Sequence, residues 1–346
     1  MTNIVTFPGL GLEFALNRVA FTIPILDRPV YWYGVIIASG LLLAVYLCMR
    51  WAPRFGIVPD HIIDLMLFAV PVALVAIRAY YVIFNLGLYR REDGSLDWAA
   101  ILRYSDGGLA IYGAIISSAI VLLIFCKVRK VNFLAFADLG VHGLFIGQLI
   151  GRWGNFMNRE AFGAQTDSFL RMGLTDASGA TIYVHPTFLY ESVWNAIGLL
   201  ILHFYSKRRK FDGQIFLMYL GWYGLGRMFI EGLRTDSLYV GSSNLRVSQL
   251  LAGICFLAVV IFLVYDKIFR EHDPRDLYVN QVAQRKAAEA VEATEAAAEE
   301  TASEVEEAAE NAAEDAEDEE TVEAEEAAET EAEAAPEDAS DEDTEA

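Results

Sequence analysis

Several motifs that define common enzyme classes do not occur in this sequence. It has no Gly-x-Ser-x-Gly turn of lipases, no His-Glu-x-x-His of zinc proteases and no Gly-x-x-x-x-Gly-Lys-Ser/Thr loop of ATPases. Cysteine is scarce as well: Cys48, Cys126 and Cys255 each lie in an apolar segment, without metal-binding spacing or a disulfide framework. Those three activities therefore have no motif behind them, and we expect neither a metal nor another cofactor.

Three further features are missing, and each argues against a class of protein. Residues 1–28 contain no basic segment followed by a continuous apolar run, so we expect no cleavable signal peptide. No unit of about 20–50 residues repeats along the chain, which argues against a solenoid. No basic patch is interleaved with aromatic residues, so nucleic acid is not an expected partner.

Charge is distributed unevenly along the chain. The formal net charge is -21, but residues 271–346 alone contain 30 acidic and 3 basic residues, whereas residues 1–270 contain 17 acidic and 23 basic residues. We therefore predict a basic, apolar body at 1–270, which suits a membrane with anionic lipids, and an acidic Ala/Glu-rich tail at 271–346. The tail cannot bury enough apolar surface to fold by itself, so we expect it to be disordered, with transient helix. It is either solvated or in contact with a basic partner.

Seven apolar stretches in the body approach the length of about 20 residues that crosses a bilayer. They lie at 30–49, 62–84, 107–126, 133–150, 187–205, 214–230 and 247–268. Runs of this length without alternating polarity indicate helices. The predicted fold class is all-α: a polytopic membrane protein with seven transmembrane helices. Residues 1–29 contain three prolines and are expected to be irregular.

Basic residues follow every odd-numbered stretch. The clusters are Arg50 with Arg54, Lys127 with Arg129 and Lys130, the four residues from Lys207 to Lys210, and Lys267 with Arg270. Because the cytoplasmic ends of membrane helices carry an excess of Lys and Arg, we predict an N-terminus outside and a cytoplasmic tail. The loop at 85–105 has mixed charge and is an exception. It is assigned to the outer face together with the loops at 151–186 and 233–246.

A run of polar residues and glycines, GRWGNFMNREAFG, occupies residues 151–163 directly after the fourth apolar stretch. Polar groups at the edge of a bilayer are expensive and are rarely kept without a use. If the helix continues, Arg152 and Asn155 share a face, and a guanidinium beside an amide suits an anion such as phosphate. For Arg152 alone, a snorkelling arginine at a helix end is the alternative. The run as a whole, with Asn158 and Glu160, favours a binding site.

A second polar stripe lies in and after the sixth stretch. Tyr223, Arg227, Glu231 and Arg234 follow one another at intervals of four, four and three residues, so a helix would carry them on one face. Arg227 and Glu231 can pair, which lowers the cost of placing both charges in a membrane. Either this pair is a structural salt bridge, or Glu231 aims Arg227 at a bound anion.

Other polar residues lie within the apolar stretches. Tyr33 lies near the start of the first apolar stretch, and a belt of aromatic residues at the membrane interface explains its position equally well. Asp138, near the inner end of the fourth, is either functional or a structural partner of another helix. The charged groups expected at the depth of an outer-leaflet phospholipid head group are Arg78, Arg152, Glu191, Arg227 and Glu231.

Taken together, these motifs resemble the signature of the prolipoprotein diacylglyceryl transferase family. The motif at 151–163 is long and specific. The other matching landmarks, in chain order, are Trp32-Tyr33-Gly34, Arg78, Asp106-Gly107-Gly108, Asp138, the segment His185-Pro186-Thr187-x-Leu189-Tyr190-Glu191, and the stripe from Tyr223 to Arg234. The resemblance covers about residues 30–270 and not the acidic tail.

Members of this family are bacterial enzymes with seven membrane helices and an external N-terminus. They transfer the diacylglyceryl group of phosphatidylglycerol to the lipobox cysteine of a prelipoprotein, which leaves a thioether and releases glycerol phosphate. The resemblance therefore implies a transferase of the bacterial cell membrane whose active site faces the outer leaflet. Its implied partners are phosphatidylglycerol and prelipoprotein signal peptides; the oligomeric state is left open.

The resemblance also implies roles for individual residues. Fixed guanidinium groups would neutralise the phosphate leaving group, and a cationic site would favour the cysteine thiolate. The expected head-group ligands are Arg78, Arg152, Asn155, Arg227 and Arg234, and the expected catalytic residues are Tyr33, Tyr112, Glu160 and Glu231.

Two positions depart from the family pattern. Many members carry a histidine, proposed as the base, where this chain has Tyr112. A phenol is a poor base at neutral pH, so Tyr112 is assigned only as an orienting or proton-relay residue, and the identity of the base stays open. Phe188 stands where glutamine is usual.

Two other functions would use the same polar groups. A lipid or anion transporter is the main alternative, but transporters usually show an internal repeat or paired broken helices, and the sequence shows neither. A non-catalytic scaffold with a structural polar core would leave the clustering of charge on the outer side unexplained.

Overall fold

The computed structural model describes residues 3–25, 27–91, 93–104, 107–176, 178–234 and 246–333. Most of the loop expected at 233–246 lies outside these ranges. The chain divides into two compact units, Met1–Val282 and Ala283–Ala346. The first unit contains the long apolar helices and two small sheets. The described part of the second unit is the continuation of one helix.

Each of the seven apolar stretches forms a helix. These helices are α1 (Trp32–Trp51), α2 (Asp60–Phe84), α4 (Ile111–Arg129), α5 (Phe133–Asn158), α6 (Thr187–Tyr205), α7 (Gln214–Ile230) and α8 (Val247–Phe269). Within the described residues, five of them (α1, α2, α4, α5 and α8) are long and apolar enough to cross a membrane. The prediction of a mostly helical, multi-pass membrane protein is confirmed at this level.

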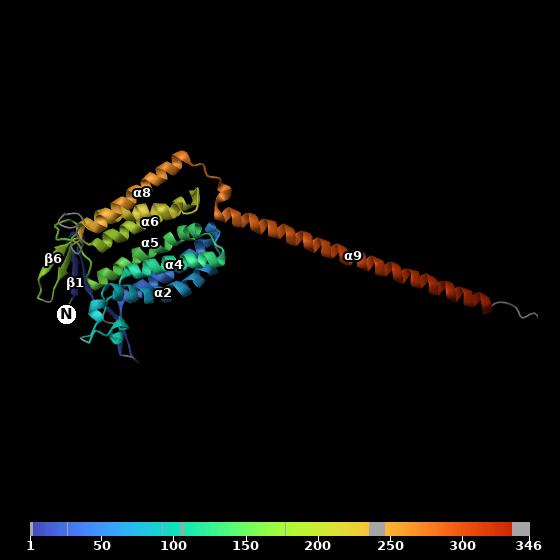
Figure 1. Ribbon diagram of the computed structural model, residues 1–346, viewed down its shortest axis with the longest axis horizontal. Helices are drawn as coiled ribbons and strands as arrows, with labels where there is room; N and C mark the ends of the chain where they lie inside the picture. Colours follow the sequence, from blue (N-terminus) through green and yellow to red (C-terminus); the bar gives the residue numbers. More distant parts are fainter. Residues whose placement is uncertain are drawn as a thin grey trace, which may run out of the picture. The chain divides into compact units, whose positions relative to one another are not determined.

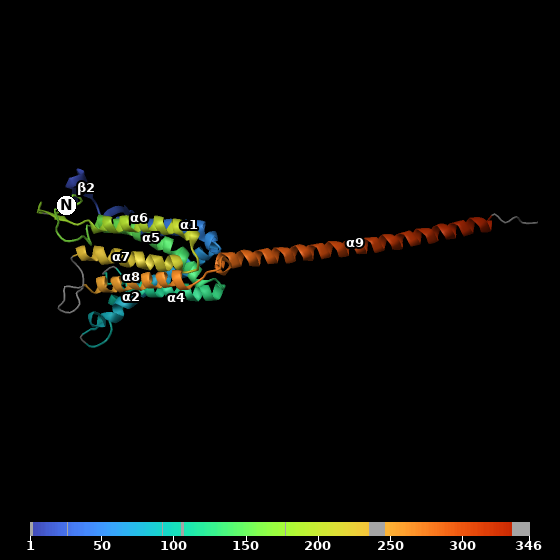
Figure 2. The ribbon, with the colours of Figure 1, turned by 90° about the horizontal axis from the view of Figure 1, so that it is seen from above.

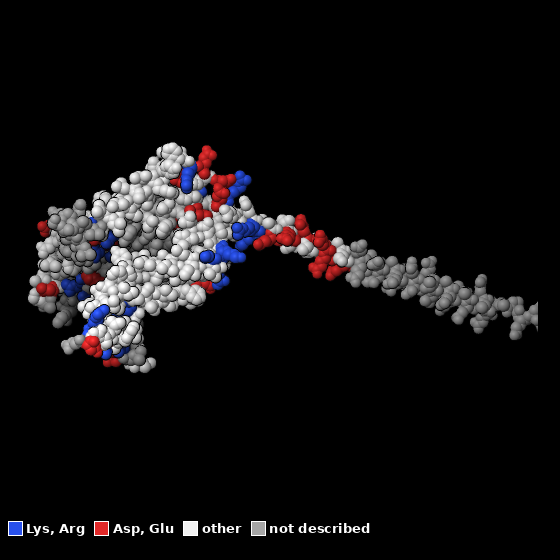
Figure 3. All heavy atoms as spheres, viewed as in Figure 1, with Lys and Arg blue, Asp and Glu red and all other residues white. Residues whose placement is uncertain are grey.

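The helices of the first unit lie side by side around α5, which packs against α1, α4, α6 and α7 (Figures 1 and 2). Half of the most apolar part of α5 is buried, against 6% for α8. Large apolar side chains such as Leu42, Phe68 and Ile261 are exposed on the outer helices. On the face seen in Figure 3, charged side chains gather at the two ends of the helices and are nearly missing between them. This distribution suits a hydrocarbon layer around the middle of the helices.

The first residues form strands, so the expectation of an irregular segment at 1–29 was wrong. β1 (Asn3–Phe7) pairs with β2 (Leu12–Leu16) and, across the sequence, with β5 (Met172–Thr175), which pairs with β6 (Thr181–Val184). The hairpin of β3 (Val19–Ile23) and β4 (Arg28–Tyr31) leads into α1. The partner of β1 is about 170 positions away, and no local pattern reveals such a pairing.

The four-stranded sheet packs on the end of α5 and the start of α6. Val5 and Phe7 are buried against Phe156 of α5 and Phe188 of α6. Arg18 also donates a hydrogen bond to the backbone carbonyl of Asn158, at 2.7 Å. The N-terminal strands therefore hold the segment that follows Arg152 in place.

Contacts with α5 and α6 fix the position of α7. Asp138 of α5 is fully buried, and its carboxylate accepts backbone N–H groups of Gly213 and Phe216, at 2.9 and 2.8 Å, at the start of α7. This arrangement supports the structural reading of Asp138, because a carboxylate stabilises a helix N-terminus. On the side facing α6, the indoles of Trp194 and Trp222 stack on each other.

The remaining described helices are short, except the last. They are α3 (Trp98–Ile101), single 3-10 turns such as η2 (Ala52–Phe55), η5 (Ser206–Arg208) and η6 (Glu231–Leu233), and α9 (Tyr278–Glu333). Residues 278–333 of the acidic tail form a helix in the structure, where we expected transient helix in a disordered tail. Ala and Glu are strong helix formers, so local propensity accounts for a helix without a packed core.

The start of α9 belongs to the first unit. The backbone N–H of Tyr278 donates to the Asp212 carboxylate at 2.8 Å, and its ring packs against the cluster around Phe55. The body therefore extends past the boundary expected at residue 270, to Val282.

Candidate active site

The polar run at 151–163 begins inside a helix. α5 continues through it to Asn158 and ends at Arg159, whose φ of 56° is left-handed. The helix places Arg152 and Asn155 on one face, with Arg152 Nη1 3.5 Å from Asn155 Oδ1. The predicted shared face is confirmed.

Glu191 is the centre of a charged cluster. It lies in the second turn of α6, its side chain is 6% exposed, and it forms an ion pair with Arg152 of α5. Nη1 of Arg227 lies 3.9 Å from Glu191 Oε2, and Nη1 of Arg234 lies 3.6 Å from Glu191 Oε1. Three guanidinium groups from separate segments therefore converge on one buried carboxylate.

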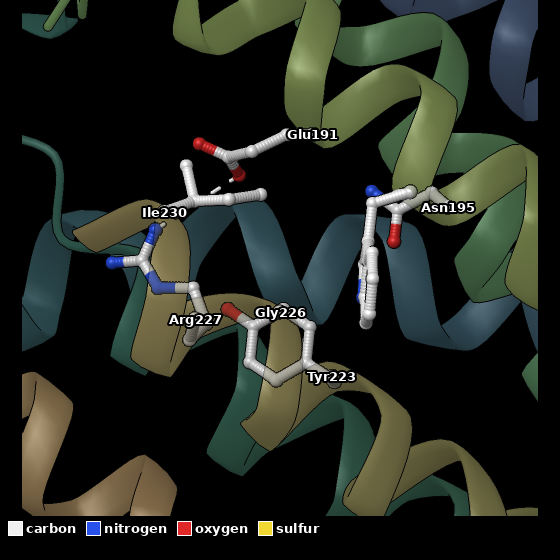
Figure 4. A pocket seen from close by; sticks show the side chains of 7 residues that line it. Glu191, Asn195, Tyr223, Gly226, Arg227 and Ile230 are labelled. Atoms are coloured by element: carbon white, nitrogen blue, oxygen red, sulfur yellow. Dashed lines mark ion pairs between the residues drawn. The ribbon is translucent and has the colours of Figure 1, made fainter. Parts of the chain in front are cut away.

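Glu231 adds a second carboxylate to this cluster. It follows α7 directly, and its Oε2 lies 2.6 Å from Nη2 of Arg227, one turn earlier. Figure 4 shows Arg227 reaching from α7 toward Glu191, with Tyr223 and Asn195 lining the same pocket. This pocket is small, with a volume of about 10 Å³.

A second, more exposed group lies on the other side of Arg152. The Asn155 amide donates to Glu160 Oε1 at 3.0 Å. The charges of Glu160 and Arg152 both act on Tyr33, at the start of α1. The Tyr33 ring lies against Gly154, where an added Cβ would be 2.8 Å from ring carbon Cδ2. The glycine in this motif therefore permits the close approach of Tyr33.

Gly163, at the end of the motif, brings the remaining segments together. Its N–H donates to the His185 carbonyl at 2.9 Å, and the next residue, Ala164, donates to the carbonyl of Leu233 at 2.7 Å. An added Cβ at Gly163 would lie 2.8 Å both from His185 Cβ and from the Leu233 oxygen. This crossing places Arg234 beside the start of α6, and side chains larger than glycine do not fit.

Arg78 is not brought into the cluster. Its guanidinium is buried and donates to the backbone carbonyls of Ala100, Ile101, Gly107 and Gly108, at 2.5 to 3.0 Å. It also lies over the Tyr89 ring. Within the described residues these contacts use all three of its nitrogens, so the geometry argues against the expected head-group contact. Arg78 instead fixes the loop between α2 and α4.

The described contacts of Tyr112 do not include any residue of the charged cluster around Glu191 either. It lies in the first turn of α4, is 61% exposed, and its ring centroid is 6.2 Å from that of Tyr80. Asp106, from the same motif, lies outside the described residues. At this end of the helices, the described contacts join Arg152 to Asn155 and Asn155 to Glu160, but they do not join Tyr112 to any of the three.

Comparison with known proteins identifies the family. A model of the family described as prolipoprotein diacylglyceryl transferase matches residues 18–265. This chain belongs to the prolipoprotein diacylglyceryl transferase family.

Relatives named phosphatidylglycerol–prolipoprotein diacylglyceryl transferase match along most of their length. The protein of Enterococcus faecalis is 41% identical over 280 residues, covering 78% of this chain and 96% of the relative. That of Bacillus cytotoxicus is 40% identical over 266 residues, covering 75% and 95%. That of Lactiplantibacillus plantarum is 41% identical over 286 residues, covering 80% and 97%.

The structure also accounts for one departure from the family pattern. Phe188, where the resemblance led us to expect glutamine, is buried and stacks on Phe156, with ring centroids 4.8 Å apart. The Trp153 ring packs on it edge-on. In this member of the diacylglyceryl transferase family, position 188 is therefore part of the apolar cluster beneath the sheet.

The sequence did not predict the partners of Glu191. Glu191 was expected among the charged groups at head-group depth, but not as the common partner of three arginines. The sequence signal for Glu191 was its position about one turn after Thr187, where α6 begins. The identity of its partners required the packing of α5, α6 and α7.

Proposed function

We propose that this chain transfers the diacylglyceryl group of phosphatidylglycerol to the lipobox cysteine thiol of prelipoproteins and releases glycerol phosphate. Membership of the transferase family favours this reaction over transport of a lipid or anion. The observation that carries the site assignment is the convergence of Arg152, Arg227 and Arg234 on Glu191.

The cluster suits a phosphodiester. The guanidinium groups of Arg152, Arg227 and Arg234 face the carboxylate of Glu191. The phosphodiester of phosphatidylglycerol carries one negative charge, which guanidinium groups bind well. In this proposal the phosphate of the head group accepts hydrogen bonds from guanidinium N–H groups that face Glu191 when no lipid is bound.

The same groups assist the reaction. The cysteine sulfur attacks the glyceryl carbon that bears the phosphate ester; a C–S bond forms, and the C–O bond breaks with its electron pair going to the phosphate oxygen. The departing glycerol phosphate gains negative charge, which preorganised guanidinium groups stabilise. They also lower the pKa of a nearby thiol and so favour the attacking thiolate.

Glu160 is our candidate for the group that receives the thiol proton. Asn155 holds its carboxylate by a hydrogen bond of 3.0 Å, and Tyr33 lies close to it. Tyr112 has no described contact with these residues, so we assign it no proton-transfer step. Arg78 supports the neighbouring loop and does not bind the head group in this proposal.

The proposed placement in the membrane follows from the basic clusters. All seven long helices cross the bacterial inner membrane, the N-terminus is outside and the acidic tail is cytoplasmic. The end of α5, the start of α6 and the end of α7 then lie at the outer leaflet, where phosphatidylglycerol and the exported cysteine are both accessible. The positive-inside rule supports this orientation.

The test is transfer from labelled phosphatidylglycerol to a lipobox peptide, with glycerol phosphate measured in parallel. The proteins to compare are the wild type, Arg152→Ala, and the control Arg90→Ala, whose side chain is exposed in the loop after α2. We expect label on the peptide and equal release of glycerol phosphate for the wild type and the control, and neither for Arg152→Ala. Transfer by Arg152→Ala at the wild-type rate would refute the site. Vesicle uptake of lipid without transfer would favour the transporter.

A further inference from the structure

A larger pocket lies at the opposite end of the helices from Glu191. Its volume is about 440 Å³, and it is formed by η2, η5 and the first residues of α9. About fifteen residues of α6 separate Glu191 from this end, which corresponds to roughly 22 Å along the helix. The pocket is therefore separate from the candidate active site, and it is within the size range of small-molecule sites.

Every charged residue that lines this pocket is basic. Arg54 comes from η2, and Lys207 and Arg209 come from η5 and the residue after it. In the sequence these residues belong to two separate basic clusters, which were interpreted only as signals of topology. Tertiary packing brings the two clusters to one cavity. Figure 3 shows Lys and Arg side chains gathered at the end of the first unit from which α9 begins.

Arg209 is built into the wall of the pocket. Its side chain is 6% exposed, it lies over the Phe55 ring at 4.4 Å, and it donates to the carbonyls of Ser206 and Arg54 at 3.3 and 3.0 Å. Its Nε has no hydrogen-bond partner among the described residues; the nearest carboxylate oxygen, of Asp212, is 3.9 Å away. A buried guanidinium with an unused donor is costly unless an anion compensates it.

Two further features favour an anion. The carboxylates of Asp138 and Asp212 both act on Arg209, but each also accepts backbone N–H groups, Asp138 those of Gly213 and Phe216 and Asp212 that of Tyr278. Burial also raises the pKa of the Asp212 carboxyl group. In addition, Val279 and Asn280 line the pocket in the first turn of α9, so the positive end of this helix adds to the three basic side chains.

We propose that this pocket binds a phosphate-bearing anion, which is either the head group of an anionic lipid or free phosphate. The guanidinium groups of Arg54 and Arg209 and the ammonium group of Lys207 supply the charge, and Leu277 and Val279 form an apolar wall. Such a ligand joins η2, η5 and the start of α9, and thereby stabilises this end of the first unit. The proposal does not depend on the transfer reaction.

The test compares two variants with the same change in charge. The pocket variant is Arg54→Gln/Lys207→Gln. The matched control is Arg50→Gln/Arg208→Gln, in which both residues are exposed in the same two basic clusters but do not line the pocket. The full-length proteins, in an uncharged detergent at constant ionic strength, are titrated with inorganic phosphate in one arm and with micellar phosphatidic acid in the other. The thermal unfolding midpoint is measured.

We expect the midpoint of the wild type and of the control to rise with at least one probe, and most of this rise to be lost in the pocket variant. Binding at the active-site arginines contributes equally to all three proteins, so it cancels in the comparison. A response to phosphatidic acid alone identifies a lipid head group, and a response to inorganic phosphate identifies a free anion as a ligand. An equal rise in the pocket variant and the control, or no rise in the wild type, overturns the proposal. Because unfolding is measured without turnover, a failure of the transfer assay does not affect this result.

Discussion

Trp194 of α6 and Trp222 of α7 are joined reciprocally: their rings stack with centroids 4.4 Å apart, and each indole N–H donates to the other's backbone carbonyl at 3.1 Å. Glycines make room for both rings, since an added Cβ would lie 2.4 Å from Trp222 Nε1 at Gly198 and 2.3 Å from Trp194 Nε1 at Gly226. Trp194 is three residues after Glu191, and Gly226 directly precedes Arg227. The tryptophan pair therefore sets the register that brings Glu191 and Arg227 together.

The first prediction concerns this register. Gly226→Ala should lower the free energy of unfolding by about 1–3 kcal/mol, because the new methyl group forces the Trp194 ring away from α7. Transfer should fall about tenfold, since a small displacement of reacting groups is expensive. The control is Gly140→Ala in α5, where an added Cβ meets nothing within 4 Å. Equal unfolding midpoints and rates for the two variants would show that the tryptophan pair does not set the site.

The second prediction concerns Glu191 as a positioning residue. Glu191→Gln keeps the shape of the side chain but removes the charge that three guanidinium groups share, so kcat should fall about 10²-fold. The KM for phosphatidylglycerol should change less, because the arginines are still present. Steady-state kinetics in mixed micelles separate the two constants.

A double-mutant cycle checks how Glu191 acts. If it works by holding the arginines, the variant Glu191→Gln/Arg234→Gln should be no slower than the slower of the two single variants. If the fold-losses in rate of the two single variants multiply in the double variant, Glu191 has a role that is independent of the arginine.

The third prediction separates Arg78 from head-group binding. Arg78→Ala leaves four backbone carbonyls without a donor, so we expect a loss of about 2–4 kcal/mol in stability and faster proteolysis of the loop between α2 and α4. The KM for phosphatidylglycerol of the folded fraction should stay within about twofold of the wild type. A selective rise in KM without loss of stability would restore Arg78 to the head-group site.

The fourth prediction concerns Tyr112. Its side chain is exposed and its described contact is the Tyr80 ring, so Tyr112→Phe should retain transfer within about threefold of the wild type. Glu160→Gln should lose about 10²-fold if its carboxylate accepts the thiol proton. The measurement is the rate of peptide labelling across pH for both variants. A large loss in Tyr112→Phe that changes with pH would make the phenol a proton relay.

The fifth prediction compares two truncations. Ending the chain after Val282 removes the acidic helix but keeps the contact between Tyr278 and Asp212, so transfer and the unfolding midpoint should match those of the full chain. Ending it after Arg270 also removes that contact and the packing of Tyr278, so the midpoint should fall by several degrees. Loss of transfer in the longer truncation would give the tail a role in the reaction.

The sequence by itself determined the helical membrane architecture, because the length and apolarity of each stretch are local properties. It also determined the face shared by Arg152 and Asn155 and the pair formed by Arg227 and Glu231, since helical periodicity relates residues three or four positions apart. The specific motif at 151–163 was sufficient to indicate the family before any contact was known.

Tertiary structure alone decided which of the polar groups meet. Nothing in the spacing of Glu191 revealed that it joins Arg152, Arg227 and Arg234, because these contacts depend on how α5, α6 and α7 pack. The same applies to Arg78, whose depth resembled that of the other arginines but whose donors are used by a loop. The strand pairing of β1 with β5 and the meeting of two basic clusters at one pocket are likewise long-range contacts, which no local pattern encodes.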